Sequence, residues 1–195
     1  MYKGFFKRVF DFAFALVMLM ILLIPLLLIA LIIKLDSKGP VLFTQKRVGR
    51  DKKHFTIYKF RSMKTDAPGN TATHLLKDPE AFITKTGKFL RKSSLDELPQ
   101  LINILTGDMS LIGPRPALWN QYDLIEKRDA FGANAVRPGL TGLAQVSGRD
   151  ELEIGEKARL DGEYVKNITF IGDMKIIFDT FKSVLSSKGY REGKK

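Results

Sequence analysis

Two adjacent carboxylates, Asp96 and Glu97, lie where acidic, basic and proline residues are packed most densely in the sequence. Arg91 precedes them, and the turn at residues 113–116, which contains Arg115, follows. An ionised carboxylate can attack phosphorus and form an acyl phosphate. A neighbouring carboxylate can hold a hard divalent cation with water and phosphate oxygens, and arginines stabilise charge on phosphoryl oxygens. These residue types indicate phosphoryl transfer, with Asp96 as the nucleophile and Glu97 as the metal ligand.

The same spacing has a structural alternative. Ser94 and Glu97 are three residues apart, as in a capping box, in which two side chains bond each other's backbone N–H groups at a helix start. Asp96 would also suit a helix N-terminus, where its pKa would stay low and the side chain ionised. Pro99 removes one backbone donor from the same first turns. Capping and phosphoryl chemistry both fit the spacing.

Further charged residues could contribute to an anion site. Lys59 and Arg61 are two positions apart at the end of a predicted strand, so they share a face if the strand continues. A solvated basic edge that prevents aggregation is the alternative. Arg137 and Arg149 flank a glycine-rich stretch that could approach a nucleotide closely. Asp161, on a predicted helix, could face the same site or form a surface salt bridge.

Residues 12–33 form an uncharged, apolar run of 22 residues. As a helix it would measure about 33 Å, which matches the hydrocarbon core of a bilayer. Pro25 lies within it and should bend the helix. Lys and Arg flank both ends, and the positive-inside tendency places both ends on the cytoplasmic side. A bent, re-entrant helix satisfies both signals; a plain spanning helix is the alternative, because it avoids unpaired backbone groups at Pro25. A cleaved signal peptide would have a shorter run and a cleavage site.

The overall composition narrows the class of protein. The 195 residues include 32 Lys and Arg against 21 Asp and Glu, a net charge of +11. Such an excess favours polyanionic partners, such as anionic membranes, nucleotides or nucleic acid. Cysteine is absent, which excludes disulfides, zinc–thiolate sites and thiol catalysis.

The remaining patterns predict an α+β fold. Residues 41–45 and 54–60 read as strands of a short hairpin. Residues 151–165 predict a helix, and a last amphipathic helix should begin at Asp173 as its N-cap. Further amphipathic interfacial helices would surround a small catalytic core.

Three regions follow from these patterns, and they form one functional unit. Residues 1–36 would be the re-entrant membrane helix, broken at Pro25. Residues 37–188 would be a catalytic domain on the cytoplasmic face, and residues 189–195 a basic tail.

Four ordered motifs resemble those of the bacterial sugar transferases, the monotopic phosphoglycosyl transferases that begin glycoconjugate synthesis on polyprenol phosphate. The motifs are YKFRSM at 58–63, SLDELPQ at 94–100, GDMSLIGPRP at 107–116 and RPGLTGLAQ at 137–145. The similarity extends from the basic N-terminus to about residue 185. The chain resembles in particular the small, single-domain capsule-type members.

The resemblance implies transfer of a sugar-1-phosphate from a UDP-sugar, with an N-acetylamino sugar expected, to undecaprenyl phosphate, with release of UMP. It implies a covalent phospho-sugar on Asp96, Mg²⁺ held by Glu97, and a re-entrant helix broken at Pro25. The enzyme would be monotopic in the bacterial inner membrane, facing the cytoplasm, at the first membrane step of capsule, O-antigen, exopolysaccharide or glycoprotein glycan synthesis. The residues expected to contact substrate or its phosphates are Lys59, Arg61, Arg91, Arg115, Arg137, Arg149 and Asp161.

The sequence departs from the family pattern at a few positions. Ile24 precedes Pro25 where the family often has Ser, and Leu143 replaces a common Trp. Membrane lipids are expected partners, and a homo-oligomer is compatible with the sequence. A non-enzymatic scaffold on anionic lipids would explain the charge and the apolar run but not the four motifs. A nucleic-acid binder is not expected, because no recognised module accompanies the basic residues.

Overall fold

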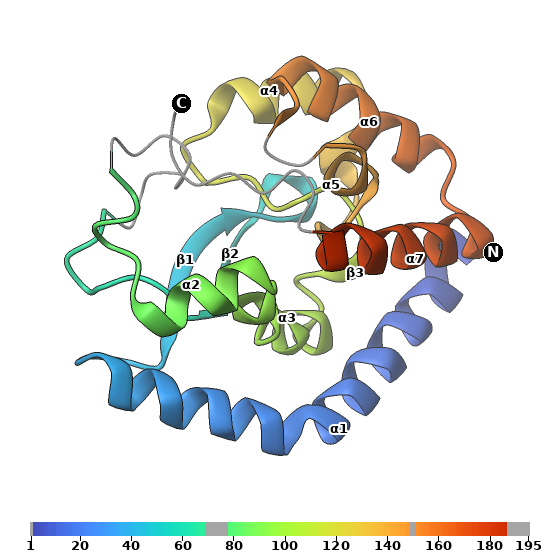
Figure 1. The fold of residues 1–195 in the computed structure, drawn as a ribbon. Helices are drawn as coiled ribbons and strands as arrows, with labels where there is room; N and C mark the ends of the chain where they lie inside the picture. The colour runs from blue at the N-terminus through green and yellow to red at the C-terminus, as the bar shows by residue number, and fades with distance from the viewer. Residues whose placement is uncertain (1, 69–77, 149–150, 187–195) are drawn as a thin grey trace.

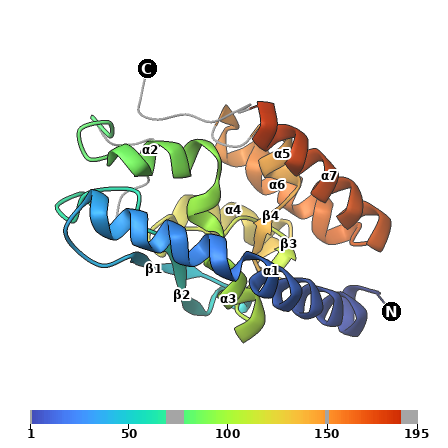
Figure 2. The same cartoon turned by 60° about the horizontal axis from the view of Figure 1, so that its bottom comes forward.

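The computed structural model describes residues 2–68, 78–148 and 151–186. Arg149 and the predicted basic tail lie outside the described residues. The chain mixes helices with two small sheets, which confirms the predicted combination of α and β elements. Figures 1 and 2 show the long helix α1 (Lys7–Asp36) along one side of the molecule. In Figure 1 the hairpin of β1 (Leu42–Val48) and β2 (His54–Phe60) lies between α1 and α4 (Tyr122–Ala130).

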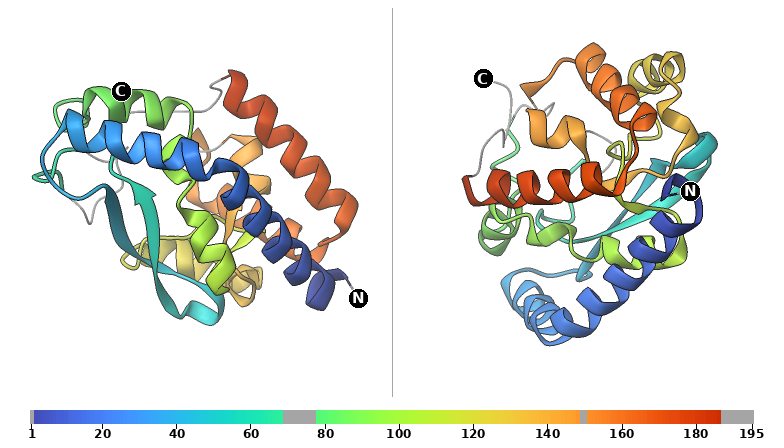
Figure 3. Two further views of the ribbon diagram at one scale, coloured as in Figure 1. Left: turned by 90° about the horizontal axis from the view of Figure 1, so that it is seen from below. Right: turned by 90° about the vertical axis from the view of Figure 1, so that its right-hand side faces the viewer.

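The N-terminal apolar run forms one long helix. A π-helical turn, η1 (Tyr2–Phe6), leads into α1 (Lys7–Asp36), which contains Pro25. Figures 1 and 3 show that α1 bends part-way along, as a proline inside a helix favours. Most of its large apolar side chains are exposed. Among the described residues it is the one helix long and apolar enough to cross a membrane.

One face of the first turns of α1 is buried against the rest of the protein. Lys7, Asp11 and Ala15 follow each other at helical spacing, and all three are buried. The carboxylate of Asp11 accepts hydrogen bonds from Oγ of Ser110 at 2.6 Å and from the backbone N–H of Leu111 at 3.2 Å. These contacts fix the start of α1 to the strand that precedes the GPRP turn, residues 113–116.

A buried ion pair joins α1 to the last helix, α7 (Phe170–Ser186). Nζ of Lys7 lies 2.6 Å from Oδ2 of Asp173, and the hydroxyl groups of Tyr2 and Tyr164 donate to the same carboxylate. The prediction that Asp173 caps this helix was therefore wrong. Thr169 precedes the helix and accepts from the backbone N–H of Gly172, and Asp173 lies inside, where it satisfies buried donors.

The predicted hairpin is present. Strands β1 (Leu42–Val48) and β2 (His54–Phe60) pair antiparallel through the turn η2 (Arg50–Lys52), and Phe43 lies opposite Lys59. Helix α3 (Gln100–Thr106) packs on β2 and on α1. The buried amide of Asn103 donates to the carbonyl of Thr56 at 2.8 Å and accepts from the N–H of Tyr58 at 3.0 Å, so α3 is fixed to the hairpin.

The acidic pair lies between two helices. The 3-10 turn η4 (Leu95–Glu97) connects α2 (Lys85–Lys92) to α3. Leu95 packs against a cluster of Ile33 from the end of α1, Phe60 from β2 and Leu90 from α2. The C-terminal end of α1 therefore lies beside the turn that carries the carboxylates.

The second half of the chain contributes the strands and helices that pack next to the GPRP turn. Strands β3 (Ser110–Ile112) and β4 (Gly139–Thr141) form a short parallel pair. Three helices and a 3-10 turn complete the fold beside α7: α4 (Tyr122–Ala130), η5 (Ala133–Ala135), α5 (Leu143–Ser147) and α6 (Ile154–Lys166). The predicted helix at 151–165 is thus confirmed as α6, with its start three residues later.

Candidate active site

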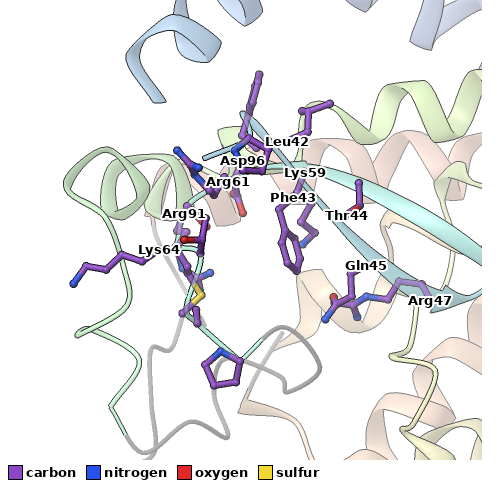
Figure 4. A pocket seen from close by; sticks show the side chains of 17 residues that line it. Leu42, Phe43, Thr44, Gln45, Arg47, Lys59, Arg61, Lys64, Arg91 and Asp96 are labelled. Carbon is purple, nitrogen blue, oxygen red and sulfur yellow. The ribbon is translucent and has the colours of Figure 1, made fainter. Parts of the chain in front are cut away.

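A pocket of about 320 Å³ opens beside the acidic pair. Its walls come from β1, from the end of β2 and the segment after it, and from Arg91 and Asp96 (Figure 4). The volume is in the range of small-ligand sites. The pocket therefore brings the predicted nucleophile Asp96 together with the predicted cations Lys59, Arg61 and Arg91.

Asp96 is buried but lines this pocket; only 8% of its surface is exposed. Burial raises the pKa of its carboxyl to about 6, and the charge of Lys59 opposes this rise while that of Glu97 adds to it. The expectation of a low pKa was wrong, because removal from water outweighs the nearby cations. A carboxylate with this pKa is a stronger base than an exposed one, and most of it is still ionised at neutral pH.

Glu97 points into a cluster of cations. Its Oε1 lies 2.8 Å from Nζ of Lys59 and 2.7 Å from Nη2 of Arg115. Burial acts to raise the pKa of Glu97, but the charges of Arg115 and Lys59 and their hydrogen bonds hold it well below its usual range. The two neighbouring carboxylates therefore have opposite pKa shifts, a pattern typical of sites in which two acids have different roles.

The capping-box interpretation of this turn was wrong. Ser94 has φ +57°, in the left-handed region, and its side chain makes no capping bond to the helix start. The carboxylate of Glu97 accepts from Lys59 and Arg115 instead of from the backbone N–H of Ser94. The side chain of Glu97 is therefore held by tertiary ion pairs.

The GPRP turn holds Arg115 against Glu97, and close backbone packing fixes the turn. The N–H of Gly113 donates to the carbonyl of Thr141 at 2.9 Å, and the N–H of Gly139 donates to that of Pro114 at 2.9 Å. A Cβ atom on Gly139 would overlap backbone atoms of Gly113. The glycines of the glycine-rich stretch after Arg137 thus serve this backbone contact, and residues 139–141 of that stretch form β4.

Arg91 and Arg61 approach the pocket from different elements. Arg91 lies in the last turn of α2. This helix packs so closely on the segment after β2 that a Cβ atom on Gly87 would overlap the backbone of Ser62. Arg61 is almost fully buried and donates to the carbonyl oxygens of Ser37 at 2.7 Å and Lys38 at 2.8 Å. The contacts of Arg61 therefore hold the end of α1 beside the pocket.

Comparison with known proteins identifies the family. Residues 2–187 match the family model described as bacterial sugar transferase. The chain belongs to the bacterial sugar transferase family. The resemblance drawn from the four motifs is confirmed, and with it the assignment as a transferase enzyme.

Three relatives show the range of the family. The chain is 42% identical to the uncharacterized sugar transferase EpsL of Bacillus subtilis, over 95% of this chain and 90% of that protein. It is 43% identical to the UDP-glucose:undecaprenyl-phosphate glucose-1-phosphate transferase of Escherichia coli, over 94% of this chain and 41% of that protein. It is 39% identical to an Aeromonas hydrophila UDP-N-acetylgalactosamine-undecaprenyl-phosphate N-acetylgalactosaminephosphotransferase, over 96% of this chain and 45% of that protein. This transferase spans less than half the length of the last two relatives.

Other predicted site residues of the transferase lie elsewhere. Arg137 donates from Nε to the carbonyl of Gly107 at 2.7 Å, at the C-terminal end of α3, where a cation is favourable. Asp161 is buried in an ion pair with Arg128, at 2.6 Å, which joins α6 to α4. Neither lines the pocket. Arg149 lies outside the described residues.

Sequence reasoning missed Arg47, which lines the pocket of the transferase. It lies on β1 on the same face as Phe43, four residue pairs along from Phe43, which lies opposite Lys59. Strand alternation places Phe43, Gln45 and Arg47 on one face. This signal was readable in the sequence, but the segment was interpreted as a basic flank of the membrane helix.

Proposed function

We propose that this transferase moves a sugar-1-phosphate from a UDP-sugar to undecaprenyl phosphate and releases UMP. The observation that carries the proposal is the placement of Asp96: a buried carboxylate that lines a cationic pocket, beside the end of a long apolar helix. The names of the relatives from Escherichia coli and Aeromonas hydrophila support undecaprenyl phosphate as the acceptor.

In the first half-reaction the carboxylate of Asp96 attacks the phosphorus that carries the sugar. The bond from this phosphorus to the bridging oxygen breaks, and UMP leaves with that oxygen and its electron pair. Lys59 and Arg91, whose charges act on Asp96, and Arg115 are available to stabilise charge on the phosphoryl oxygens. The product is a phospho-sugar on Asp96, an acyl phosphate.

In the second half-reaction a phosphate oxygen of undecaprenyl phosphate attacks the same phosphorus. The bond between this phosphorus and Asp96 breaks, the carboxylate is regenerated, and a new diphosphate links the sugar to the lipid. One pocket therefore serves donor and acceptor in turn. The elevated pKa of Asp96, about 6, supports a carboxylate that is a better nucleophile than an exposed one.

The side chains present are compatible with a bound Mg²⁺ ion. Among the described residues no group of three His, Asp or Glu side chains is arranged to hold a metal. Mg²⁺ in phosphoryl-transfer sites is usually held by one or two carboxylates together with substrate phosphates and water. Glu97, adjacent to Asp96, meets that requirement once Lys59 or Arg115 releases one oxygen of the Glu97 carboxylate. Bound Mg²⁺ would supply charge neutralisation of the phosphates.

We further propose that α1 is re-entrant and that the pocket faces the cytoplasm. The bend of α1, the basic residues at both of its ends and the position of its C-terminal end beside η4 support this placement. A re-entrant helix would bring Asp96 to the interface, where a soluble nucleotide sugar and a lipid phosphate can both reach it.

The donor sugar is best determined by turnover. The resemblance favours an N-acetylamino sugar, and the names of the relatives carry both glucose and N-acetylgalactosamine. The purified protein should be incubated with undecaprenyl phosphate, Mg²⁺ and each member of a UDP-sugar panel, and UMP measured. We expect repeated turnover, with more than one UMP released per enzyme molecule, from at least one UDP-sugar; this turnover should depend on acceptor and be abolished by EDTA. A protein that binds anionic vesicles but releases no UMP from any donor would instead be a membrane scaffold.

A further inference from the structure

The end of the pocket away from Asp96 contains a buried cation that the proposed chemistry leaves without a role. Arg47 donates from Nη1 to the carbonyl oxygen of Pro116 at 2.9 Å and from Nη2 to Oε1 of Gln45 at 2.5 Å. Both acceptors are neutral. The Nε–H group of Arg47 is buried and has no hydrogen-bond partner among the described residues. A guanidinium group offers five N–H donors, so Arg47 retains unused bonding capacity.

The electrostatic surroundings of Arg47 favour an anionic ligand. Burial and the charge of Arg115 together lower the pKa of Arg47 to about 9, and the charge of Glu97 opposes both effects. The carboxylate of Glu97 thus forms ion pairs with Lys59 and Arg115, and only its charge acts on Arg47. Buried cations are costly unless they are paired. An anion bound beside Arg47 and Arg115 would relieve this imbalance.

The two ends of the pocket face different parts of the molecule. Asp96 follows Leu95, which packs with Ile33 at the end of α1. Arg47 forms a β-bridge with Leu118 and precedes Val48, which packs with Ala117, Leu124 and Ala158, away from α1. Figure 4 shows Gln45 and Arg47 together at the end of the pocket opposite Asp96. The Arg47 end is therefore the end remote from the membrane helix.

We propose that Arg47, oriented by Gln45, binds the phosphate that leaves with the nucleoside. The inference rests on the proposed function, because it takes a UDP-sugar as donor. A UDP-sugar has two phosphates, and Asp96 attacks the one that bears the sugar. The second phosphate must lie on the side of the pocket from which the soluble nucleotide enters and departs. A planar guanidinium matches a phosphate through parallel N–H bonds.

The test is the inhibition constant of UMP, measured against UDP-sugar turnover by the full-length protein in lipid nanodiscs. Arg47→Gln should raise this constant about 10- to 100-fold, as expected for loss of charge-assisted hydrogen bonds. The KM for undecaprenyl phosphate should stay unchanged. Arg50→Gln is the matched control, because Arg50 is exposed and lies in the turn after β1, where its nearest carboxylate is that of Asp51.

Several results would overturn the proposal. A UMP inhibition constant that is unchanged in Arg47→Gln contradicts it. A rise in the KM for undecaprenyl phosphate without a rise in the UMP constant would assign Arg47 to the acceptor phosphate instead. A purely structural role would weaken uridine and UMP equally, whereas the proposal predicts that only UMP is weakened.

A second variant keeps the test decisive if the Arg47→Gln protein does not fold. Arg47→Lys keeps the charge but not the planar fork, and we expect a smaller rise of the UMP constant than in Arg47→Gln. An unchanged constant in a folded Arg47→Lys protein, combined with an unfolded Arg47→Gln protein, would also refute the proposal. Failure of the proposed function looks different: the wild-type protein itself would then release no UMP from any UDP-sugar.

Discussion

Nζ of Lys59 lies 2.8 Å from Oε1 of Glu97, and this ion pair connects the end of the hairpin to the acidic turn. The same oxygen accepts from Arg115 at 2.7 Å, so one carboxylate joins β2 to the GPRP turn. Asp96, one residue earlier, is left facing the pocket. Of the two adjacent acids, Glu97 is therefore held by cations, whereas Asp96 is open to a substrate in the pocket.

Removal of Lys59 should impair the chemical step. Lys59→Met leaves Glu97 with Arg115 alone and removes the charge that most lowers the pKa of Asp96, so less of the nucleophile is ionised. We expect the rate of UMP release to fall by about 10²–10³-fold, as for other electrostatic groups in active sites. Lys53→Met, at an exposed position, should leave the rate unchanged. An equal rate in the two variants would contradict the role of the ion pair.

Asn103 should be essential for stability without contact to substrate. Asn103→Ala removes two partly buried hydrogen bonds to the β2 backbone and leaves the N–H of Tyr58 and the C=O of Thr56 without these partners. The expected loss is about 2–4 kcal/mol of unfolding free energy, at about 1–2 kcal/mol for each bond. Thermal unfolding measures it. The exposed Asn167→Ala serves as control, and a midpoint equal to that of the control would show that α3 is not held through Asn103.

Asp96→Asn should stabilise the protein while it inactivates the enzyme. The folded-state pKa of about 6 is above the unfolded value of 3.8, so folding favours the protonated form. The cost is absent below the unfolded pKa, grows as pH rises between the two values, and is complete above about pH 6. Asp96→Asn lacks this cost, because its side chain is never charged.

Thermal unfolding in EDTA tests this prediction. The midpoint of Asp96→Asn should exceed that of the wild-type protein above about pH 7, by about 2–4 °C for each kcal/mol relieved. The difference should shrink as the pH is lowered from the folded pKa of about 6 and disappear below the unfolded pKa of 3.8, where the wild-type carboxyl is protonated in both states. A wild-type protein that is the more stable one above pH 6 would show that the cations around Asp96 outweigh its burial.

Much of the fold could be predicted because the sequence patterns that indicate it each lie within one short stretch of the chain. The apolar run, the alternation in residues 54–60 and the helix at 151–165 each follow from periodicity, and the structure contains all three. Asp173 was misplaced because it looks like a cap when only its neighbours in sequence are known. Its partners, Lys7 and Tyr2, lie more than 160 residues away.

The site could be predicted only in part, for the same reason. Asp96, Glu97, Lys59, Arg91 and Arg115 come together as the motifs suggested. Local spacing could not reveal that Glu97 forgoes a capping bond for two distant cations. Nor could it reveal that Arg137 and Asp161 contact structural partners, since both contacts join elements distant in sequence.

The topology of α1 can be tested with single cysteines, because the chain has none. Gly4→Cys places a thiol in open space before α1, and Lys38→Cys places one just after it. With a re-entrant helix, a membrane-impermeant maleimide should label both variants in inverted inner-membrane vesicles and neither in right-side-out vesicles. Ile24→Cys, in the apolar middle of α1, should stay unlabelled in both. Labelling of Gly4→Cys and Lys38→Cys from opposite sides would establish a spanning helix.

The covalent intermediate on Asp96 is the centre of the proposed mechanism. Intact-protein mass spectrometry, after incubation with the UDP-sugar that supports turnover and Mg²⁺ but without lipid acceptor, tests it most directly. We predict a mass increase equal to one phospho-sugar, release of an equimolar amount of UMP, and loss of both in Asp96→Asn. Addition of undecaprenyl phosphate should restore the original mass. UMP release without any adduct, persisting in Asp96→Asn, would contradict the mechanism.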